Sequence, residues 1–324
     1  MMGWKERQGS MSIGGALRAA IRCCALAWSL LVGGALGTCA AVSAEASNGV
    51  TPELRQQALA TLQRVLVQEQ EWVKVHAAEF LLKLDHPQGI RDTFLQQLQD
   101  HGQEFKYRIG IWRVLARAAA DNQEAIRWTG RIRDVLADPA APDRLHAMES
   151  LAKLRYKVLP QDVKLVEDAA REPTGPMAPF AAWVLVNSGR PAGSARLADL
   201  LHGPERGLAA YALRHLDNVS PVVRQELLDL AQREPAGAEV RMYLICAAAI
   251  HAPEPQKAEF RTALLEYIQQ GSISQRYLAC ETLGHLATKA DLPLLTDLLS
   301  DPVADVRSSA AAAILRSEIG PDPN

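Results

Sequence analysis

The sequence predicts an all-α fold, an α-solenoid of about eight two-helix repeats that form a right-handed superhelix. Three observations lead to this prediction. First, in the segment 305–314 small and aliphatic residues follow Val306 at offsets of four, five, seven and eight, which is one buried stripe of a helix, and this pattern recurs along the chain. Second, another amphipathic segment precedes each copy. Third, all 18 prolines fall in predicted turns, in the tail or in the first turn of a predicted helix.

The first 44 residues differ from the rest and are predicted to be a secretory signal peptide. Lys5, Arg7, Arg18 and Arg22 precede an uncharged run at 23–44, and small residues at 42–44 suit a cleavage site. Two alternatives stay open: the run is long enough for an uncleaved membrane anchor, and Cys39 lies in a weak lipoprotein motif. We therefore expect an exported, periplasmic protein that can associate with a membrane only through this segment.

Charge and cysteine content restrict what the remaining chain can do. From residue 45 onward, 31 Lys and Arg stand against 36 Asp and Glu, with no basic stripe, so a nucleic-acid partner is not expected. Only Cys246 and Cys280 remain after the leader. Neighbouring helices lie about 8–10 Å apart, too far for most disulfides. We expect two buried free thiols.

The recurring pattern defines the inner helix of each repeat. Its copies are 28 to 36 residues apart, and they begin at Val73, Tyr107, Asp143, Met177, Glu205, Val240, Gln275 and Val306. The fourth and fifth offsets are small or apolar in every copy, such as Ala77-Ala78 and Ala310-Ala311. A fixed period of this length is typical of helical repeat proteins.

The outer helices precede these copies. They are predicted at 52–67, 89–99, 123–136, 161–170, 194–201, 221–232, 257–269 and 291–299. Thr51-Pro52 and Ser220-Pro221 are suitable first residues, because the side chain caps the helix and the proline needs no amide donor there. A pair of helices cannot bury its apolar faces alone, so the repeats must stack.

No linker divides the array, so residues 45–316 are predicted to be one solenoid and 317–324 a disordered tail. The stretch 172–203 is crowded with proline and glycine, and we interpret it as a shortened repeat.

The chain resembles the bacterial HEAT-like repeat proteins, particularly those with short phycobilin-lyase-type repeats. The resemblance rests on Asp305-Val306-Arg307 with Ala310-Ala311, on Glu205-Arg206 with Ala209-Ala210, and on Glu239-Val240-Arg241. It covers 51–316 and is specific for architecture. The tryptophan, glycine and tyrosine signature of tetratricopeptide repeats is missing.

A basic residue follows the start of seven of the eight copies. The resemblance implies that this column, together with an acid in the preceding turn, ties neighbouring repeats together. Its members are Lys74, Arg108, Arg144, Arg206, Arg241, Arg276 and Arg307. Acids that could serve are Glu71, Asp143, Glu205, Glu239 and Asp305.

Offsets six and ten of each copy share the helix face that is concave in a solenoid. In the first three repeats these positions hold the charged pairs Glu79/Lys83, Arg113/Arg117 and Glu149/Lys153. We interpret the two Glu/Lys pairs as a solvated face with helix-stabilising ion pairs. The central repeats place aromatic side chains nearby, and such residues often anchor partners. The candidate partner-binding residues are Phe180, Trp183, Tyr211, His215, Tyr243, Tyr277, Glu281 and His285.

Signatures of enzymes, cofactors and metal sites are missing from the sequence. The eight histidines are scattered, and no phosphate-binding loop or nucleophile motif occurs. The sequence therefore predicts a non-enzymatic scaffold or adaptor, without a cofactor or a metal, that binds a protein partner on its concave face. An accessory subunit of a membrane complex, such as a transporter or electron-transfer assembly, is the alternative, and a lyase-like enzyme is a further one.

Overall fold

The computed structural model describes residues 49–319, and within this range it contains sixteen α-helices, three short 3-10 helices and no strand. The all-α prediction is confirmed. The predicted signal peptide lies outside the described residues, as do residues 320–324. Residues 317–319, predicted to belong to a disordered tail, instead continue the last helix.

The α-helices form pairs along the chain, in which an odd-numbered helix is followed by an even-numbered one, as the two interleaved sequence patterns predict. The odd-numbered helices are Pro52–Gln68 (α1), Ile90–His101 (α3), Asn122–Ala137 (α5), Val163–Arg171 (α7), Pro191–Leu200 (α9), Pro221–Arg233 (α11), Gln256–Gln270 (α13) and Leu292–Asp297 (α15). The even-numbered helices are Glu71–Lys83 (α2), Arg108–Arg117 (α4), Arg144–Lys153 (α6), Met177–Asn187 (α8), Arg206–Arg214 (α10), Glu239–His251 (α12), Ile273–Leu283 (α14) and Ala304–Ile319 (α16). The 3-10 helices are Pro160–Asp162, Lys289–Asp291 and Leu298–Ser300.

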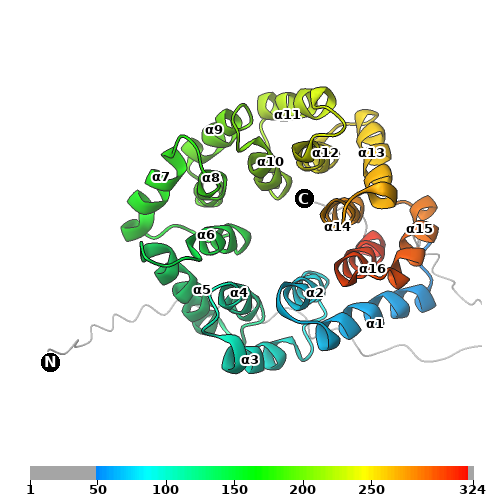
Figure 1. Cartoon of the computed structure of the whole chain (residues 1–324), viewed down its shortest axis with the longest axis horizontal. Helices are drawn as coiled ribbons and strands as arrows, with labels where there is room; N and C mark the ends of the chain where they lie inside the picture. Colours follow the sequence, from blue (N-terminus) through cyan, green and yellow to red (C-terminus); the bar gives the residue numbers. More distant parts are fainter. Residues whose placement is uncertain (1–48, 320–324) are drawn as a thin grey trace, which may run out of the picture. The chain divides into compact units, whose positions relative to one another are not determined.

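The helices form two concentric layers (Figure 1). The even-numbered helices lie around a common centre and are called the inner layer here; the odd-numbered helices lie outside them and are called the outer layer. Each inner helix packs on the outer helix before it and on the next inner helix.

The last helix returns to the first. Helix α16 packs against both α1 and α2, so the inner and outer layers close on themselves (Figure 1). The repeat pattern does not predict this contact, since an open superhelix leaves its two ends apart. In the closed array the inner helices lie around one centre (Figure 1).

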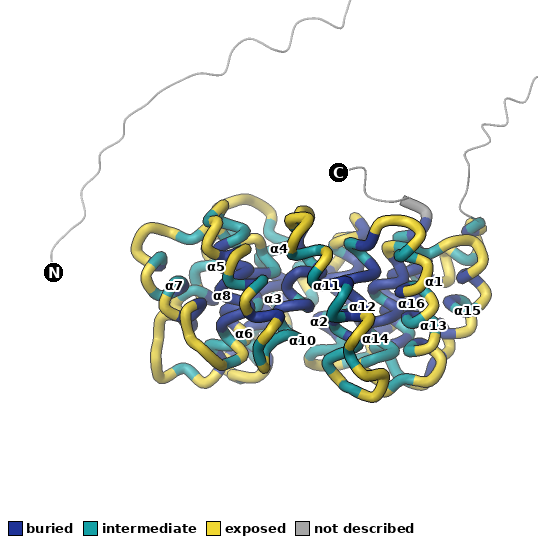
Figure 2. The backbone as a smooth tube through the Cα atoms, turned by 90° about the horizontal axis from the view of Figure 1, so that it is seen from above, coloured by how far each residue is buried: buried dark blue, intermediate teal, exposed yellow. Residues whose placement is uncertain are grey.

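The core lies between the two layers. Figure 2, an edge-on view, shows buried stretches along the helices and exposed stretches mainly in the connections at their ends. The fourth and fifth offsets of the inner pattern are its centre: Ala77, Ala78, Ala209, Ala210 and Ala310 have no exposed surface. Small side chains at these positions let the backbones approach closely. At Gly193 of α9 an added Cβ would lie 2.5 Å from the carbonyl oxygen of Ala182, so only glycine fits between α8 and α9. This close approach explains why glycine stands in the irregular stretch 172–203.

The helix starts follow the predicted capping. The hydroxyl of Thr51 accepts a hydrogen bond from the amide of Leu54, and that of Ser220 accepts one from Val223, each just before a proline at the first helical position.

Both remaining cysteines are buried and free, as expected. Burial raises the pKa of Cys246, and it raises the pKa of Cys280 to about 12, so both stay protonated thiols. Between residues 49 and 319, none of the helices combines the length and the apolar character that crossing a bilayer requires.

Candidate functional site: a charged pocket at the centre of the inner layer

A pocket of about 730 Å³ lies where the inner helices face one another. Its lining comes from α2, α4, α6, α8, α10 and α14, together with residues just after α6 and α10. The lining residues are His76, Glu79, Phe80, Leu82, Lys83, Ala116, Arg117, Glu149, Lys153, Leu154, Arg155, Trp183, Tyr211, His215, Tyr277 and Glu281. Nine of these sixteen residues stand at offset six or ten of the inner pattern. The periodic columns of the sequence therefore meet in one pocket.

The predicted aromatic residues form a cluster on one side of the pocket. Tyr211 makes edge contacts with Phe180, Trp183 and Tyr243, at centroid distances of 6.3, 6.5 and 6.4 Å. The imidazole of His215 stacks on Trp183 at 5.0 Å with an interplanar angle of 2°. Trp183 and Phe180 are 3% and 5% exposed, so they support the wall rather than offer an open surface.

The structure brings some of the eight candidate partner-binding residues to the pocket and leaves others outside its lining. Trp183, Tyr211, His215, Tyr277 and Glu281 line it. Phe180 and Tyr243 pack behind Tyr211, and the exposed His285 instead contacts Arg316, with 3.1 Å between Nδ1 and Nη1. Glu281 and His285 therefore have different partners.

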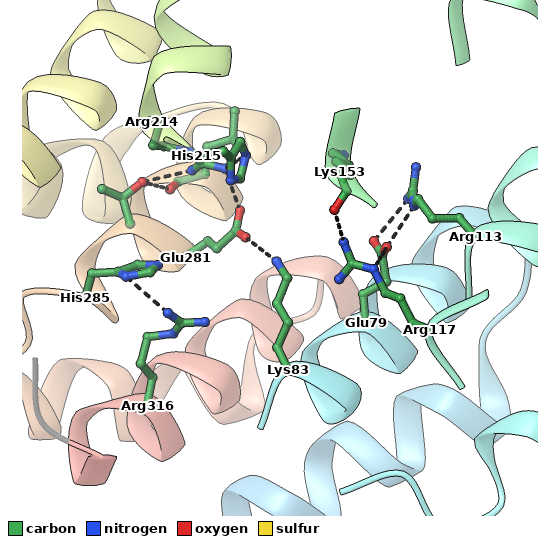
Figure 3. Close-up of polar contacts among 12 residues, drawn as sticks. Glu79, Lys83, Arg113, Arg117, Lys153, Arg214, His215, Glu281, His285 and Arg316 are labelled. Carbon is green, nitrogen blue, oxygen red and sulfur yellow. Dashed lines mark hydrogen bonds and ion pairs between the residues drawn. The ribbon is translucent and has the colours of Figure 1, made fainter. Parts of the chain in front are cut away.

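Buried ion pairs surround the pocket (Figure 3), and two of their cations, Lys153 and Arg214, lie over the ring of Tyr211 at 5.5 and 5.2 Å from its centroid. The guanidinium of Arg113, only 1% exposed, donates to both carboxylate oxygens of Glu79 at 2.8 and 3.0 Å and to the hydroxyl of Ser150 at 3.0 Å. Burial alone would raise the pKa of Glu79, but the charges of Arg113 and Arg117 outweigh it and hold the pKa well below its usual range. The interpretation of Glu79 as part of a solvated face is wrong, since Glu79 is 7% exposed and binds the next helix.

Two further carboxylates, those of Glu149 and Glu281, also pair with cations. Lys153 lies 2.8 Å from Glu149 in the same helix, and Arg214 lies 3.0 Å from Glu281 across the pocket wall. Although burial opposes ionisation, these cations keep the pKa values of both glutamates below normal. Of the two expected Glu/Lys pairs, Glu149 with Lys153 forms the ion pair within its helix, whereas Glu79 pairs with arginines of the next helix.

Lys83 and Arg117 are less well compensated. The Nζ of Lys83 lies 3.6 Å from Glu281, which Arg214 already binds more closely, and the Nε of Arg117 lies 3.7 Å from Glu79, which Arg113 binds. Burial lowers the pKa of Lys83 further than Glu281 and Glu79 raise it, and Arg117 and Lys153 add repulsion. The pKa of Arg117 is lowered by burial as well, against the attraction of Glu79. These two cations therefore share carboxylates that other cations have already neutralised.

Three polar side chains among the aromatic residues, those of Tyr211, Tyr277 and His215, are neutral. Burial raises the pKa values of Tyr211 and Tyr277 and lowers that of His215 well below normal. Among residues 49–319, neither tyrosine hydroxyl has a hydrogen-bond partner, and both tyrosines are part-exposed on the pocket wall. Two hydroxyl donors are thus available to a ligand.

His76 belongs to the lining and marks the contact between the first and last repeats. Its Nδ1 lies 3.0 Å from the carboxylate of Asp305 in α16, and its ring stacks on Tyr277 at 5.2 Å. An adjacent carboxylate fixes the orientation of an imidazole.

The predicted column of basic residues lies away from the pocket, between the inner and outer layers. Three members donate to carbonyl oxygens at the end of the preceding outer helix: Lys74 to Leu66, Arg144 to Leu136 and Arg276 to Ile268. Others bind carboxylates further along the chain: Arg108 binds Asp143, Arg206 binds Glu234, and Arg276 also binds Asp301. Arg241 donates weakly to the hydroxyl of Tyr267 at 3.5 Å.

Arg307 extends this series across the closure. It donates to the carbonyl oxygen of Asp301 and to the carboxylate of Glu69, at 2.8 and 3.3 Å. Glu69 follows α1 as Glu234 follows α11, so the last and first repeats are joined by the same kind of contact as internal neighbours. Of the acids considered, Asp143 takes this role, whereas Glu71 pairs with Lys106 and Asp305 with His76.

Sequence reasoning missed His76, which lines the pocket, and Arg214, which pairs with the lining residue Glu281, and it misjudged the burial of the charged columns. His76 and Arg214 stand outside offsets six and ten, so the repeat pattern carried no signal for them. Among the described residues, no group of three or more His, Cys, Asp or Glu side chains is arranged to hold a metal ion. Comparison of the chain with family models, with curated proteins and with solved structures gave no match.

Proposed function

We propose that this protein is a non-enzymatic binding protein that holds a small molecule in its central pocket. The observation that carries the proposal is the pocket itself, whose volume of about 730 Å³ lies within the range of about 300–1,000 Å³ typical of small-molecule sites. Its sixteen lining residues include aromatic side chains and seven charged ones, so it is more polar than the usual small-molecule site, in which a few polar groups fix the orientation of the ligand.

The proposed architecture is an α-solenoid of eight HEAT-like helix pairs that closes into a ring. The contact of α16 with α1 and α2 and the shared type of arginine contact, in Arg206 with Glu234 and Arg307 with Glu69, support closure. In a closed array the concave face becomes the pocket, so a partner there must be narrow. The predicted protein partner on that face gives way in this proposal to a small ligand. Export to the periplasm by cleavage after residue 44 remains part of the proposal, on the evidence of the leader sequence.

The protonation states of the pocket favour binding over proton transfer. General acids and bases work best with a pKa near the operating pH. Glu79, Glu149 and Glu281 have lowered pKa values and are bound to cations, while the pKa values of Tyr211 and Tyr277 are raised. These groups keep one protonation state near neutral pH, as a fixed recognition surface does.

Filling the pocket tests the proposal. Ala116 is part-buried and lines the pocket, so Ala116→Phe adds a ring without removing a contact, and Ala120→Phe adds the same ring at an exposed position beyond the end of the same helix. The full chain, purified gently from its native cells, should carry a small molecule that mass spectrometry detects after denaturation. We expect A116F to lose this molecule and A120F to retain it. Equal retention by both variants, or a wild-type protein that carries nothing, would contradict the proposal.

The contact of His76 with Asp305 favours a second candidate function, an enzyme in which His76 acts as a general base on the bound molecule. A carboxylate 3.0 Å from Nδ1 leaves the other ring nitrogen to accept a proton. In this case the wild type converts the captured molecule slowly into a product, whereas His76→Gln binds it without conversion. Unchanged captured molecule after prolonged incubation with the wild type would rule this candidate out.

A further inference from the structure

The charges around the pocket do not balance. Three groups of ion pairs lie in and around the pocket, and together they contain five cations and three carboxylates: Lys83, Arg113, Arg117, Lys153 and Arg214 against Glu79, Glu149 and Glu281. The surplus is two positive charges. The pair of Arg155 with Asp217, at 2.8 Å, is neutral as a whole and largely exposed, and Asp305 behind His76 offsets one charge at most. With Arg155, Asp217 and Asp305 included, the groups in and around the pocket are six cations and five carboxylates, which leaves a surplus of one positive charge.

The surplus can be assigned to two residues. Arg113, Lys153 and Arg214 each have a carboxylate oxygen at 2.8 to 3.0 Å, whereas the nearest carboxylate oxygens to Lys83 and Arg117 lie at 3.6 and 3.7 Å. Only the first three distances are within the range of charge-assisted hydrogen bonds. Both Lys83 and Arg117 line the pocket, Lys83 with its side chain one-third exposed and Arg117 one-fifth exposed. A ligand can reach each of them.

The groups that a ligand meets are mainly hydrogen-bond donors. Lys83 and Arg117 offer charged donors, and the hydroxyls of Tyr211 and Tyr277 offer neutral ones. The carboxylate acceptors are already engaged, since Glu79, Glu149 and Glu281 each pair with a cation. Donors without acceptors recognise a molecule with several oxygen acceptors and a negative charge.

We infer that the pocket binds a small organic anion whose carboxylate or phosphate contacts Lys83 and Arg117. The remainder of that molecule is a flat or apolar body that faces Tyr211 and Tyr277. This inference rests on the proposed function and adds the chemical class of the ligand. The excess of positive charge and the lack of nearby acceptors disfavour cationic and sugar-like neutral ligands.

Calorimetric titration of the full chain with four single-ring aromatic probes of different charge tests which ligand charge the pocket prefers. The probes are phenyl phosphate, benzoate, benzyl alcohol and benzylamine, at fixed ionic strength, because salt weakens exposed charge interactions. We expect the two anions to bind at least about tenfold more tightly than the alcohol, equivalent to about 1.4 kcal/mol, and benzylamine not to bind. Tighter binding of phenyl phosphate identifies a phosphate ligand, and tighter binding of benzoate identifies a carboxylate.

Single substitutions then test whether Lys83 and Arg117 are the residues that contact the anion. Lys83→Met and Arg117→Met should each weaken binding of the preferred anion about tenfold or more, and Lys83→Arg, which keeps the charge, should restore much of it. Lys164→Met is the control, because Lys164 is 85% exposed in the outer layer. Circular dichroism must show that each variant is folded. Tyr277→Phe removes one neutral donor and should weaken binding less than either charge removal.

Three results would overturn the inference: equal binding of benzyl alcohol and the anions, no binding of either anion by the wild type, or unchanged anion binding in both K83M and R117M. The two proposals fail separately. If a native small molecule is lost from A116F while the charge tests fail, the pocket binds a ligand of another class; if A116F loses nothing, the proposed function itself is wrong.

Discussion

Two sets of cations on the same helices meet different surroundings. Between the layers, arginines such as Arg206 bind a carboxylate or a carbonyl oxygen of their own at hydrogen-bond distance. Around the central pocket, five cations share three carboxylates, and the nearest carboxylate oxygens to Lys83 and Arg117 lie at 3.6 and 3.7 Å, although Arg117 also donates to the carbonyl oxygen of Lys153 at 2.9 Å. The comparison indicates that the ratio of cations to carboxylates, rather than residue type, distinguishes the structural contacts from the proposed ligand site.

The largest effect should come from removing a carboxylate from the pocket. Glu79→Gln leaves Arg113, which is 1% exposed, beside a neutral amide, and breaking one partner of a buried ion pair costs about 3–5 kcal/mol. Urea denaturation of the full chain should show this as a lower midpoint with an unchanged slope. A loss below about 1 kcal/mol would mean that the pocket network is solvated like a surface pair.

Acid should remove the same contribution. The folded-state pKa of Glu79 is below its unfolded value near 4.3, so its stabilising effect is complete above about pH 5 and is lost as the pH falls through the folded pKa. The difference in unfolding free energy between the wild type and E79Q should therefore be constant from pH 7 to 5 and shrink below pH 4. A difference that grows on acidification would show that the sign of the pKa shift is wrong.

Removing a carboxylate between the layers should cost much less. Glu234→Gln weakens the contact with Arg206. The Arg206 and Glu234 side chains are 35% and 11% exposed, against 1% and 9% for Arg113 and Glu79, so the loss should lie nearer the value of about 0–1 kcal/mol for surface pairs. The same denaturation experiment compares it directly with E79Q. Equal losses in the two variants would erase the distinction between the two sets of cations.

The smallest effect has the opposite sign. Because burial and repulsion lower the pKa of Lys83, Lys83→Met should raise the stability of the ligand-free protein, by about 0.5 kcal/mol or less as is usual for accessible positions. In saturating phenyl phosphate the order should reverse, since only the wild type gains binding free energy. A destabilised K83M without ligand would indicate that Lys83 serves mainly to neutralise Glu281.

Much of the fold could be predicted from local pattern. The eight inner and eight outer helices follow from the spacing of apolar residues and from capping pairs such as Thr51-Pro52, because both signals act within one or two helical turns. Closure could not be predicted. It depends on a small rotation at each repeat that accumulates along the array, and no local pattern states its sum.

The same limit explains the pocket. The repeat pattern predicts that offsets six and ten share one face, but in an open array Glu79 and Lys83 are surface residues with each other as neighbours. Closure places Lys83 near Glu281, 198 positions along the chain, and α4 supplies Arg113 to Glu79. Burial then turns an ordinary charged face into a network with a surplus.

The most direct test of the central claim is a crystal structure of the full chain with phenyl phosphate. We predict that the phosphate lies in the central pocket in contact with Lys83 Nζ and the Arg117 guanidinium, with the phenyl ring toward Tyr211 and Tyr277. A pocket that holds only solvent at a saturating probe concentration, or a phosphate bound to the arginines between the layers instead, would contradict the account.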